Sequence, residues 1–489
     1  MQHQQHLSKI GDDDEDSAER GLAALVSDGI YSQALGVLTG GALLTGCALA
    51  LGASPGFVGL LAAVPFFAQL AHVPGIVLIE KLRRRKAICV AVTLAARLLL
   101  LPLLLVPLIP SHGVALGVLL AVFAAVATLG AVGGCAWMSW TCDLVPAGRL
   151  GAVFAGRQLR ANVSGIAAAL LGGAIADGWA RWSPATPAGG YVGVFLLAVA
   201  AAMASTWYLT RMPDVPMPSA PPRGARGIGV LFARPFRDAN FRRLMVFLGS
   251  WNLAVNLATP FFMVYLLQDL HCGIGTGVAL TIVAQLANVA SLPVWGSVSD
   301  RFSNKTVIAV CAPLFLACLV GWVLAGQPAP HSLTLPLIAA IQLIVGVATA
   351  GLDLACGNIP LKLAPRGEAT VFLGANSLVK SLCAGFAPVL GGQIADRLSG
   401  MSFAFAFRWQ DGKGGGEVIL LHVAPWHVFF LSSVLLGLFA LTRLTRVDEP
   451  GEVPFGALRG RLFRKAGRRL ALMAAASLGA ARRAGVSGR

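Results

Sequence analysis

The chain has 489 residues, of which 56% are apolar and only 12% are charged. Soluble globular proteins carry roughly 25% charged residues, and single hydrophobic cores stop growing near ~250–300 residues, so one soluble domain of this kind is excluded. Apolar blocks of about 20 residues recur along the chain, the length that crosses ~30 Å of hydrocarbon. This composition predicts an all-α polytopic membrane protein.

Twelve apolar blocks are predicted to be transmembrane helices. They lie at 29–50, 57–79, 87–109, 114–140, 153–177, 190–211, 244–267, 275–298, 306–326, 333–357, 371–394 and 424–445. With a cytoplasmic N-terminus, 32 of the 38 Lys and Arg residues lie on the cytoplasmic side, four lie outside, and two, Arg97 and Lys380, lie within spans. Lys and Arg that flank spans are retained in the cytoplasm. We therefore expect a multi-pass protein of the inner, or cytoplasmic, membrane with both termini in the cytoplasm.

The net charge of +16 follows from this topology, so we expect no nucleic-acid partner. Residues 1–20 are polar and acidic and lack the basic start and apolar centre of a cleaved signal peptide. The nine cysteines show no metal-ligand or redox spacing and are interpreted as small core residues.

The sequence contains an internal repeat. LVPAGRLGAVF at 144–154 matches LAPRGEATVFL at 363–373, and LGGAIAD at 171–177 matches LGGQIAD at 390–396, both at an offset of 219 residues. Two halves of six spans each would run parallel about an axis along the membrane normal. The predicted organisation is an acidic N-tail (1–20), a six-helix half (21–211), a Pro-rich cytoplasmic linker (212–239), a second half (240–446) and a basic C-tail (447–489).

Two other segments carry predictions. Residues 456–475 alternate basic and apolar residues, which predicts an amphipathic helix on anionic lipid of the inner leaflet; the alternative is a disordered positive tail. Residues 396–423 form the one long external loop, and their GKGGGE run predicts flexibility.

The sequence GSVSDRFSNK at 296–305, between the eighth and ninth spans, resembles the G-x-x-x-D-R-x-x-[NR]-[KR] signature of the major facilitator superfamily. The first copy, GIVLIEKLRRRK at 75–86, departs from the signature in its spacing and has Glu in place of Asp. The resemblance implies twelve helices and a gating loop. An acid there can accept hydrogen bonds from the N-terminus of a neighbouring helix. The candidates for this latch are Asp300, Arg301, Lys305, Glu80, Lys81 and Arg84; the alternative is ordinary cytoplasmic loop charge.

A charge within a span is costly, so each one is a functional candidate. Lys380 lies in the eleventh span and Asp353 lies near the inner end of the tenth. In the family that the chain resembles, both spans face the central cavity, so we expect these residues to form a coupling ion pair; a purely structural pair is the alternative.

Two further charges lie in the first half. Arg97 is central in the third span, which is peripheral in that family, and this favours helix packing through backbone carbonyls over contact with the solute. Asp28 near the inner end of the first span is a candidate for a coupling proton, or for an interfacial cap or a partner of Arg157 or Arg160.

Neutral polar residues complete the candidate site. Gln33, Asn252, Asn256 and Trp137 lie within or beside spans, and the two asparagines share one helix face. Amides with aromatic residues suit a neutral or polyhydroxylated solute, and interhelical hydrogen bonding accounts for them equally well.

These features predict a secondary transporter that moves a small solute by alternating access, as a proton-coupled symporter. The alternatives are a proton-coupled efflux antiporter, a channel or receptor, and a membrane-embedded enzyme. The fifth span lacks the proline of the G-P-x-x-G-G element of drug–proton antiporters, which disfavours efflux. HExxH, GxSxG and Walker A motifs are absent from the sequence, so we expect no enzyme. We expect a monomer with no metal and no cofactor beyond a coupling proton.

Overall fold

The computed structural model describes residues 2–145, 150–215, 228–327, 331–365, 369–398, 403–411, 414–423 and 425–450. In these ranges, twelve helical segments are long and apolar enough to cross a membrane. Each overlaps one predicted span, from Glu19–Ala50 at the first to Trp426–Leu444 at the last. The predicted all-α transmembrane architecture is confirmed. The amphipathic helix predicted at 456–475 lies outside the described residues.

The described part of the chain contains sixteen α-helices, two strands and the short 3-10 helices Gln69–Ala71, Leu101–Leu104, Val106–Leu108 and Pro187–Gly189. The α-helices and strands are α1 Gln2–Leu38, α2 Gly41–Ala50, α3 Pro55–Ala68, α4 His72–Leu82, α5 Arg85–Leu98, α6 His112–Leu144, α7 Leu150–Trp182, α8 Gly190–Arg211, α9 Ile228–Arg237, α10 Ala239–Ala258, α11 Phe261–Gln268, α12 Ile274–Arg301, α13 Asn304–Ala325, α14 Thr334–Leu363, α15 Ala369–Leu398, β1 Phe403–Asp411, β2 Gly414–Val423 and α16 Pro425–Leu444.

Three spans consist of two helices each, namely α1 with α2, α3 with α4, and α10 with α11. The first break falls at Gly40 and Gly41, where Gly41 has a φ of +51°, a conformation that costs glycine little. The break between α10 and α11 falls at Pro260, which has no N–H to continue the hydrogen-bonding ladder.

Most helices pack within two groups. Helix α1 packs against α7 and α8, and α5 packs against α6; in the second group α14 packs against α12 and α13, and α10 packs against α15 and α16. The most extensive contacts between the groups are those of α3 with α15 and of α7 with α12, and α2 also contacts α11 and α12. Helices α3 and α15 touch backbone to backbone, because a Cβ built on Gly59 would lie 2.1 Å from the carbonyl oxygen of Pro388. Small residues permit such close helix contacts in membranes.

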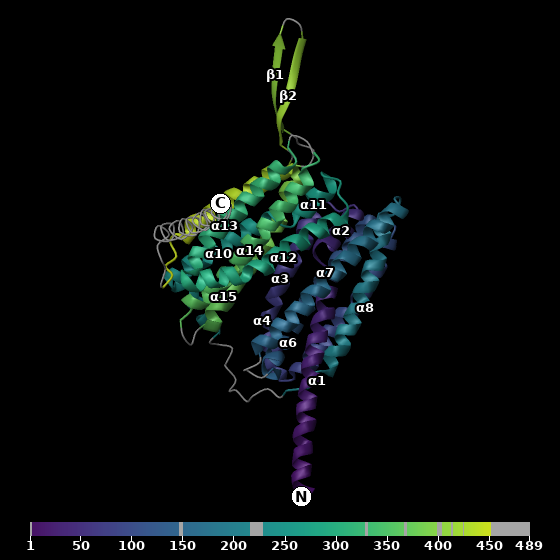
Figure 1. The fold of residues 1–489 in the computed structure, drawn as a ribbon, viewed down its shortest axis with the longest axis vertical. Coiled ribbons are helices and arrows are strands. Elements are labelled where there is room, and N and C mark those ends of the chain that lie inside the picture. The colour runs from purple at the N-terminus through teal and green to yellow at the C-terminus, as the bar shows by residue number, and fades with distance from the viewer. Residues whose placement is uncertain are drawn as a thin grey trace, which may run out of the picture.

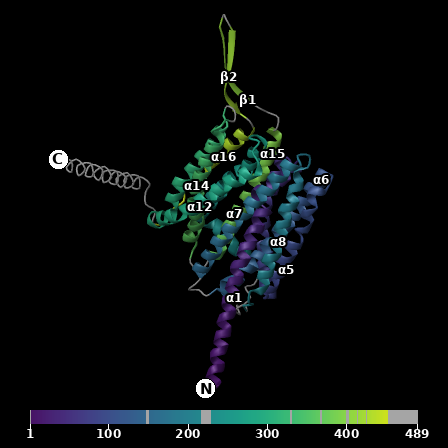
Figure 2. The ribbon, with the colours of Figure 1, turned by 45° about the vertical axis from the view of Figure 1, so that its right-hand side comes forward.

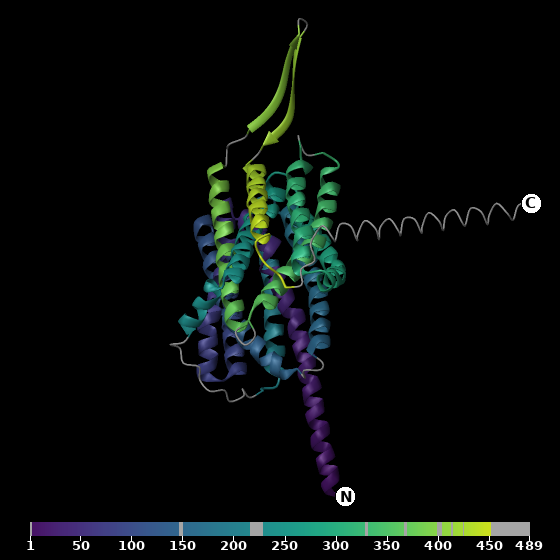
Figure 3. The ribbon, with the colours of Figure 1, turned by 90° about the vertical axis from the view of Figure 1, so that its left-hand side faces the viewer.

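The two ends of the bundle differ (Figures 1, 2 and 3). One end carries β1 and β2, which project away from the helices, and is called the hairpin end here. At the opposite end, called the linker end here, the first turns of α1 extend beyond the bundle (Figure 3). The acidic tail predicted for residues 1–20 is thus helical from Gln2 onward.

The prediction of a flexible loop at 396–423 is wrong for most of this segment. Strands β1 and β2 pair antiparallel, from Phe403 opposite Val423 to Asp411 opposite Gly414, with an irregularity between Phe405 and Ala406. The signal was present in FAFAFRWQ at 403–410, because apolar residues that alternate at a period of two are typical of a strand. The glycine run had been given more weight than this alternation.

The linker is also partly ordered. Helix α9 occupies Ile228–Arg237 within the segment that was predicted as a Pro-rich linker, and it packs against α10 and α15. Apolar residues alternate with Arg234 and Arg237 along this helix, which suits a position at the surface of the membrane.

Candidate functional site

The larger of the two best-formed cavities among the described residues has a volume of about 410 Å³ and lies between α1, α5 and α6. Polar side chains reach it from three directions: Asp28 from α1, Arg97 from α5, and Arg157 from α7. The opposite wall is short of side chains, because α6 contributes Gly130, Gly133 and Gly134. A Cβ at Gly130 or Gly134 would meet nothing within 4 Å, so these glycines leave space beside the charged cluster.

Asp28 is the acid of this cavity and is only 3% exposed. Its carboxylate accepts a hydrogen bond of 2.5 Å from the Ser205 hydroxyl and lies 3.7 Å from the Arg157 guanidinium. Arg157 also donates to the carbonyl oxygen of Leu25, at 3.3 Å. Of the roles predicted for Asp28, the partnership with Arg157 is the one that this geometry contains. Arg97 and Arg157 both interact with this buried carboxylate, so its charge depends on the two cations.

Arg97 is buried in α5 and binds α8. Its guanidinium donates to the carbonyl oxygen of Ala202 at 2.9 Å, to Thr206 Oγ1 at 2.7 Å and to Ser205 Oγ at 2.8 Å. The contact with a backbone carbonyl is the one expected for helix packing. Ser205 bridges Arg97 and Asp28, so the arginine also belongs to the polar cluster of the cavity.

Trp137 lies against Arg157 on the cavity wall. The guanidinium carbon is 4.6 Å from the centre of the indole ring, a cation–π distance, and Phe154 contacts the same ring edge-on. The buried indole N–H interacts with the Asp28 carboxylate, although it does not approach it closely enough for a well-formed hydrogen bond. A buried indole N–H usually has a partner, and here it lies in the wall of a cavity.

The predicted amides do not join this cavity. Asn252 and Asn256 donate to carbonyl oxygens of their own helix, Leu248 at 2.7 Å and Asn252 at 2.9 Å. Gln33 packs against Gly165 of α7. In these positions the amides serve the contacts of α10 and α1.

The expected ion pair between Lys380 and Asp353 is not formed. Their charges interact, but no ion pair within 4.0 Å and no hydrogen bond joins Lys380 to any residue that the structure describes. Lys380 is half-buried and Asp353 is exposed. Similar depth on adjacent spans did not make them direct partners, because the rotation of each helix also decides where a side chain points.

The residues of the predicted latch make few contacts. Asp300, Arg301, Glu80, Lys81 and Arg84 are all exposed, and no hydrogen bond or ion pair ties any of them to a described residue. Asp300 therefore does not accept hydrogen bonds from a helix N-terminus in this conformation. A different acid, Glu449, accepts hydrogen bonds from the N-terminus of α13.

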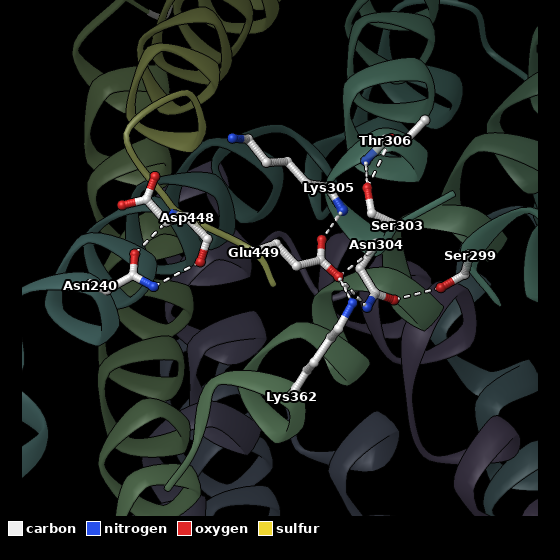
Figure 4. A network of polar contacts seen from close by, with 9 residues as sticks. All are labelled: Asn240, Ser299, Ser303, Asn304, Lys305, Thr306, Lys362, Asp448 and Glu449. Atoms are coloured by element: carbon white, nitrogen blue, oxygen red, sulfur yellow. Dashed lines mark hydrogen bonds and ion pairs between the residues drawn. The ribbon is translucent and has the colours of Figure 1, made fainter. Parts of the chain in front are cut away.

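Glu449, just beyond α16, binds the N-terminus of α13 (Figure 4). Its side chain is fully buried; it accepts from the backbone N–H of Lys305 at 2.8 Å and of Asn304 at 3.2 Å, and from Lys362 Nζ at 2.9 Å. Lys305 Nζ donates in turn to the carbonyl oxygen of Val447, at 2.8 Å. Lys305 thus ties α13 to the chain that follows α16, within one group of helices.

The first group repeats this clamp at its own residues. Arg85 lies 220 positions before Lys305 and is only 4% exposed. It forms an ion pair of 2.6 Å with Asp143 and donates to the carbonyl oxygen of Val215, beyond α8, at 3.3 Å. Arg85 belongs to the basic run GIVLIEKLRRRK at 75–86 and was not among the predicted latch residues.

Removing the Glu449 clamp should lower stability in a pH-dependent way. Burial of the carboxyl favours its neutral form, but Lys362 and the N–H groups of Lys305 and Asn304 outweigh burial and lower its pKa from 4.5. A lowered pKa means that the stabilisation is complete above the unfolded value and is lost as the pH falls through the folded value. We expect Glu449→Gln to lower the melting temperature of the purified protein at pH 7, and to lower it less as the pH falls below 4.5. Asp448→Asn, at an 81% exposed side chain, is the control and should change it little at either pH.

At the hairpin end, two aspartates at equivalent places in the repeat join the groups. Asp177 ends LGGAIAD in α7 and accepts from the N–H groups of Ile274 and Gly275, both at 2.8 Å, at the start of α12. Asp396 ends LGGQIAD in α15 and accepts from the N–H of Gly56 at 2.9 Å and from Ser54 Oγ at 3.0 Å, at the start of α3. Each carboxylate caps a helix N-terminus, where negative charge is favoured.

Sequence reasoning used the two LGG-x-IAD segments as evidence for the repeat and did not consider their aspartates as candidates. The signal that could have found them was an acid conserved between two repeat copies at the ends of spans five and eleven. Their contacts cross from one repeat to the other, so we name Asp177 and Asp396 the paired caps. In this structure the acids that accept hydrogen bonds from helix N-termini across the two halves lie at the hairpin end; the latch role of the loop acids stays a prediction.

Comparison with known proteins adds to this geometry. A family sequence model described as Major Facilitator Superfamily matches residues 29–388 and 274–484. The structure of the nucleoside transporter NupG superposes with a TM-score of 0.60 at 10% identity, covering 88% of this chain and 98% of that one. A bacterial homologue of the lysosomal transporter Spinster, inward-facing and unoccupied, gives 0.61 at 13% identity over 88% and 97%. A bacterial homologue of the iron transporter ferroportin, also inward-facing, gives 0.57 at 12% over 88% and 98%. No curated protein sequence matched.

Proposed function

Since the chain belongs to the major facilitator superfamily and is a transporter rather than an enzyme, we propose that it is a proton-coupled symporter of a small solute that works by alternating access. The observation that carries the proposal is the cavity between α1, α5 and α6, where the Asp28 carboxylate lies 3.7 Å from Arg157. Protonation of Asp28 would release Arg157 from its counter-ion. A cation that is free in one protonation state and paired in the other links proton binding to solute binding.

The chemistry of the cavity favours a solute with an acidic or strongly accepting group. Two arginines and one aspartate line it, which leaves one excess positive charge when all three are ionised. Trp137 supplies an apolar face and an indole N–H that interacts with the Asp28 carboxylate. A small solute with one anionic or accepting end and one flat or apolar end would match both features.

Alternating access needs two arrangements of the repeat halves, and the paired caps support that scheme. They join α7 to α12 and α15 to α3 at the hairpin end, while the loop acid Asp300 at the linker end has no such contact. We propose that this conformation is closed at the hairpin end, and that opening it breaks both caps.

The proposal is tested first by binding and then by flux. A panel of nucleosides, short peptides, amino acids and organic acids is screened for a rise in melting temperature, because a ligand of the folded state stabilises it by mass action. Radiolabelled hits are then tested in proteoliposomes. We expect saturable counterflow, and accumulation when an inward proton gradient is imposed. Flux that stays unsaturated at high solute concentration would show a pore. Accumulation of the solute driven by an outward-directed proton gradient would show an antiporter.

The proposed location is the cytoplasmic membrane with both termini and the linker inside. Single cysteines at Ala225 and Gly412 test this topology in a background without native cysteines. An impermeant maleimide added to intact cells should label the cysteine at position 412 and leave that at 225 unlabelled until the cells are lysed. The reverse pattern would invert the assigned orientation.

A further inference from the structure

Four arginines meet at the linker end of α10 and α16, away from the cavity of Asp28. Arg242, Arg243, Arg443 and Arg446 surround a cavity of about 160 Å³ together with Val246. We name this cluster the arginine pocket. Among the described ion pairs, the pocket has one with an acid: the Asp448 carboxylate lies 3.4 Å from Arg243. The side chain of Asp448 is 81% exposed. The pocket therefore holds a large excess of positive charge.

The guanidinium groups are only partly occupied by the protein. The Nε of Arg443 is buried and has no hydrogen-bond partner in the described residues, while its guanidinium carbon lies 4.5 Å from the ring centre of Phe439. Arg242 donates to the carbonyl oxygen of Phe236 at 3.4 Å, and Arg243 donates to that of Arg446 at 3.3 Å. The other donors around the cavity are available to a ligand, and a buried donor without a partner is costly unless one is bound.

The positions of these arginines on their helices point the same way. Arg242 and Arg243 lie near the start of α10, where the N-cap residue Asp238 already accepts a hydrogen bond of 2.7 Å from the N–H of Phe241. Together with Arg443 and Arg446 from the end of α16 they place four cations around one cavity, and an anion between them would offset their mutual repulsion. Converging guanidinium groups match the geometry of phosphate oxygens.

The surroundings of the pocket distinguish a lipid headgroup from a soluble anion. The same stripe of helix continues away from the arginines as exposed apolar surface, with Val246 at 49%, Phe439 at 44% and Leu435 at 69% exposure. Val246 follows Arg242 by one turn of α10, and Phe439 precedes Arg443 by one turn of α16. An acyl chain can lie along this stripe while the phosphate lies among the guanidinium groups.

We infer that the arginine pocket is a binding site for a phosphate-bearing anion, and specifically for the headgroup of an anionic phospholipid whose acyl chains lie along α10 and α16. The site is separate from the transport cavity and does not rest on the proposed function. It ties the start of the seventh span to the end of the twelfth, where α9 also packs against α10.

Native mass spectrometry of the purified protein with an equal mixture of phosphatidylglycerol and phosphatidylcholine tests this site. We expect the wild type to retain phosphatidylglycerol preferentially. The double variant Arg243→Gln/Arg443→Gln should bind it about 30-fold more weakly, and Arg446→Gln about fivefold more weakly. The Arg446 side chain is exposed and makes no described hydrogen bond or ion pair, so we expect Arg446→Gln to fold. This single variant therefore tests the site even if the double variant does not fold.

The matched control is Arg211→Gln/Arg301→Gln, which removes the same charge from exposed arginines outside the pocket. Arg211 stacks on Trp207 at 4.4 Å, as Arg443 stacks on Phe439, but lies in α8. The control should keep the wild-type lipid preference. An unchanged preference in both pocket variants, or an equal loss in the control, would overturn the inference.

Inorganic phosphate separates the two sources of the anion. At constant ionic strength, inorganic phosphate at about 10 mM should leave bound phosphatidylglycerol in place if the acyl chains contribute to binding. Displacement of the lipid by phosphate alone, with the same dependence on Arg243 and Arg443, would assign the site to a soluble phosphate and overturn its assignment to lipid.

Discussion

Loss of the paired caps is expected to open the hairpin end. Asp177→Asn or Asp396→Asn removes a carboxylate that accepts two hydrogen bonds at the start of the opposing helix. Hydrogen bonds to a charged group are worth about 1.5–3 kcal/mol each, and 1.4 kcal/mol is tenfold in an equilibrium. We expect each single variant to shift the population away from the closed state by about tenfold or more, and the double variant to shift it further.

The measurement is a distance distribution between spin labels on the two groups of helices. Trp182 at the end of α7 and Leu333 before α14 are 78% and 67% exposed, so cysteines there carry labels without disturbing the packing. We expect a longer-distance population to appear in the cap variants and solute flux to fall. Asp214→Asn, at an exposed acid near the linker end, is the control. A distribution that stays at wild type in the double cap variant would contradict the gating role of these aspartates.

The second expected result concerns Asp28 and Arg157. Arg157→Gln removes the ion-pair partner of a buried carboxylate and leaves it Arg97 alone, which should lower stability, by about 3–5 kcal/mol at most. Asp28→Asn keeps the hydrogen bond to Ser205 and the shape of the side chain but cannot carry a proton. We expect it to retain counterflow and to lose accumulation driven by a proton gradient. The double variant should recover part of the stability lost in Arg157→Gln, because the buried carboxylate is gone while Arg97 keeps its hydrogen bonds to α8.

Lys380→Ala and Asp353→Asn compare the two candidate coupling sites. If coupling resides at Asp28, both variants keep accumulation with an unchanged pH profile. If Asp28→Asn accumulates solute normally while Lys380→Ala does not, coupling belongs to the tenth and eleventh spans, and Asp28 is a structural partner of Arg157. Purification yield and melting temperature, measured alongside, separate loss of coupling from loss of folding.

Charged residues within spans were recognisable from sequence, but only some of their partners were. Asp28, Arg97, Asp353 and Lys380 stand out because a charge in hydrocarbon is costly. Arg157 was among the partners predicted for Asp28 and lies 3.7 Å from it, whereas pairing by depth alone selected Lys380 with Asp353, which form no ion pair. Depth is one coordinate of three, and the rotation of each helix, which its packing against neighbours sets, supplies the others.

For the capping acids, too, the sequence shows the residue but not the helix N-terminus that it binds. Glu449 lies far from Lys305 in sequence, and Asp177 lies 97 positions from Ile274. An acid beside an apolar run carries no mark that says which helix N-terminus it will meet. The repeat, however, placed Asp177 and Asp396 at equivalent positions, and two copies of one fold make equivalent contacts, so their joint role was within reach of the sequence.

By itself the sequence determined that this chain crosses a membrane twelve times and repeats one six-helix pattern, because backbone polar groups in hydrocarbon must be satisfied within each helix. That constraint is local and is written in runs of about 20 apolar residues. Only the tertiary structure decided which charges meet, that residues 403–423 form a strand pair outside the bundle, and that a cavity opens beside Gly130 and Gly134. Those outcomes depend on how helices far apart in sequence rotate and approach one another, which composition and spacing leave open.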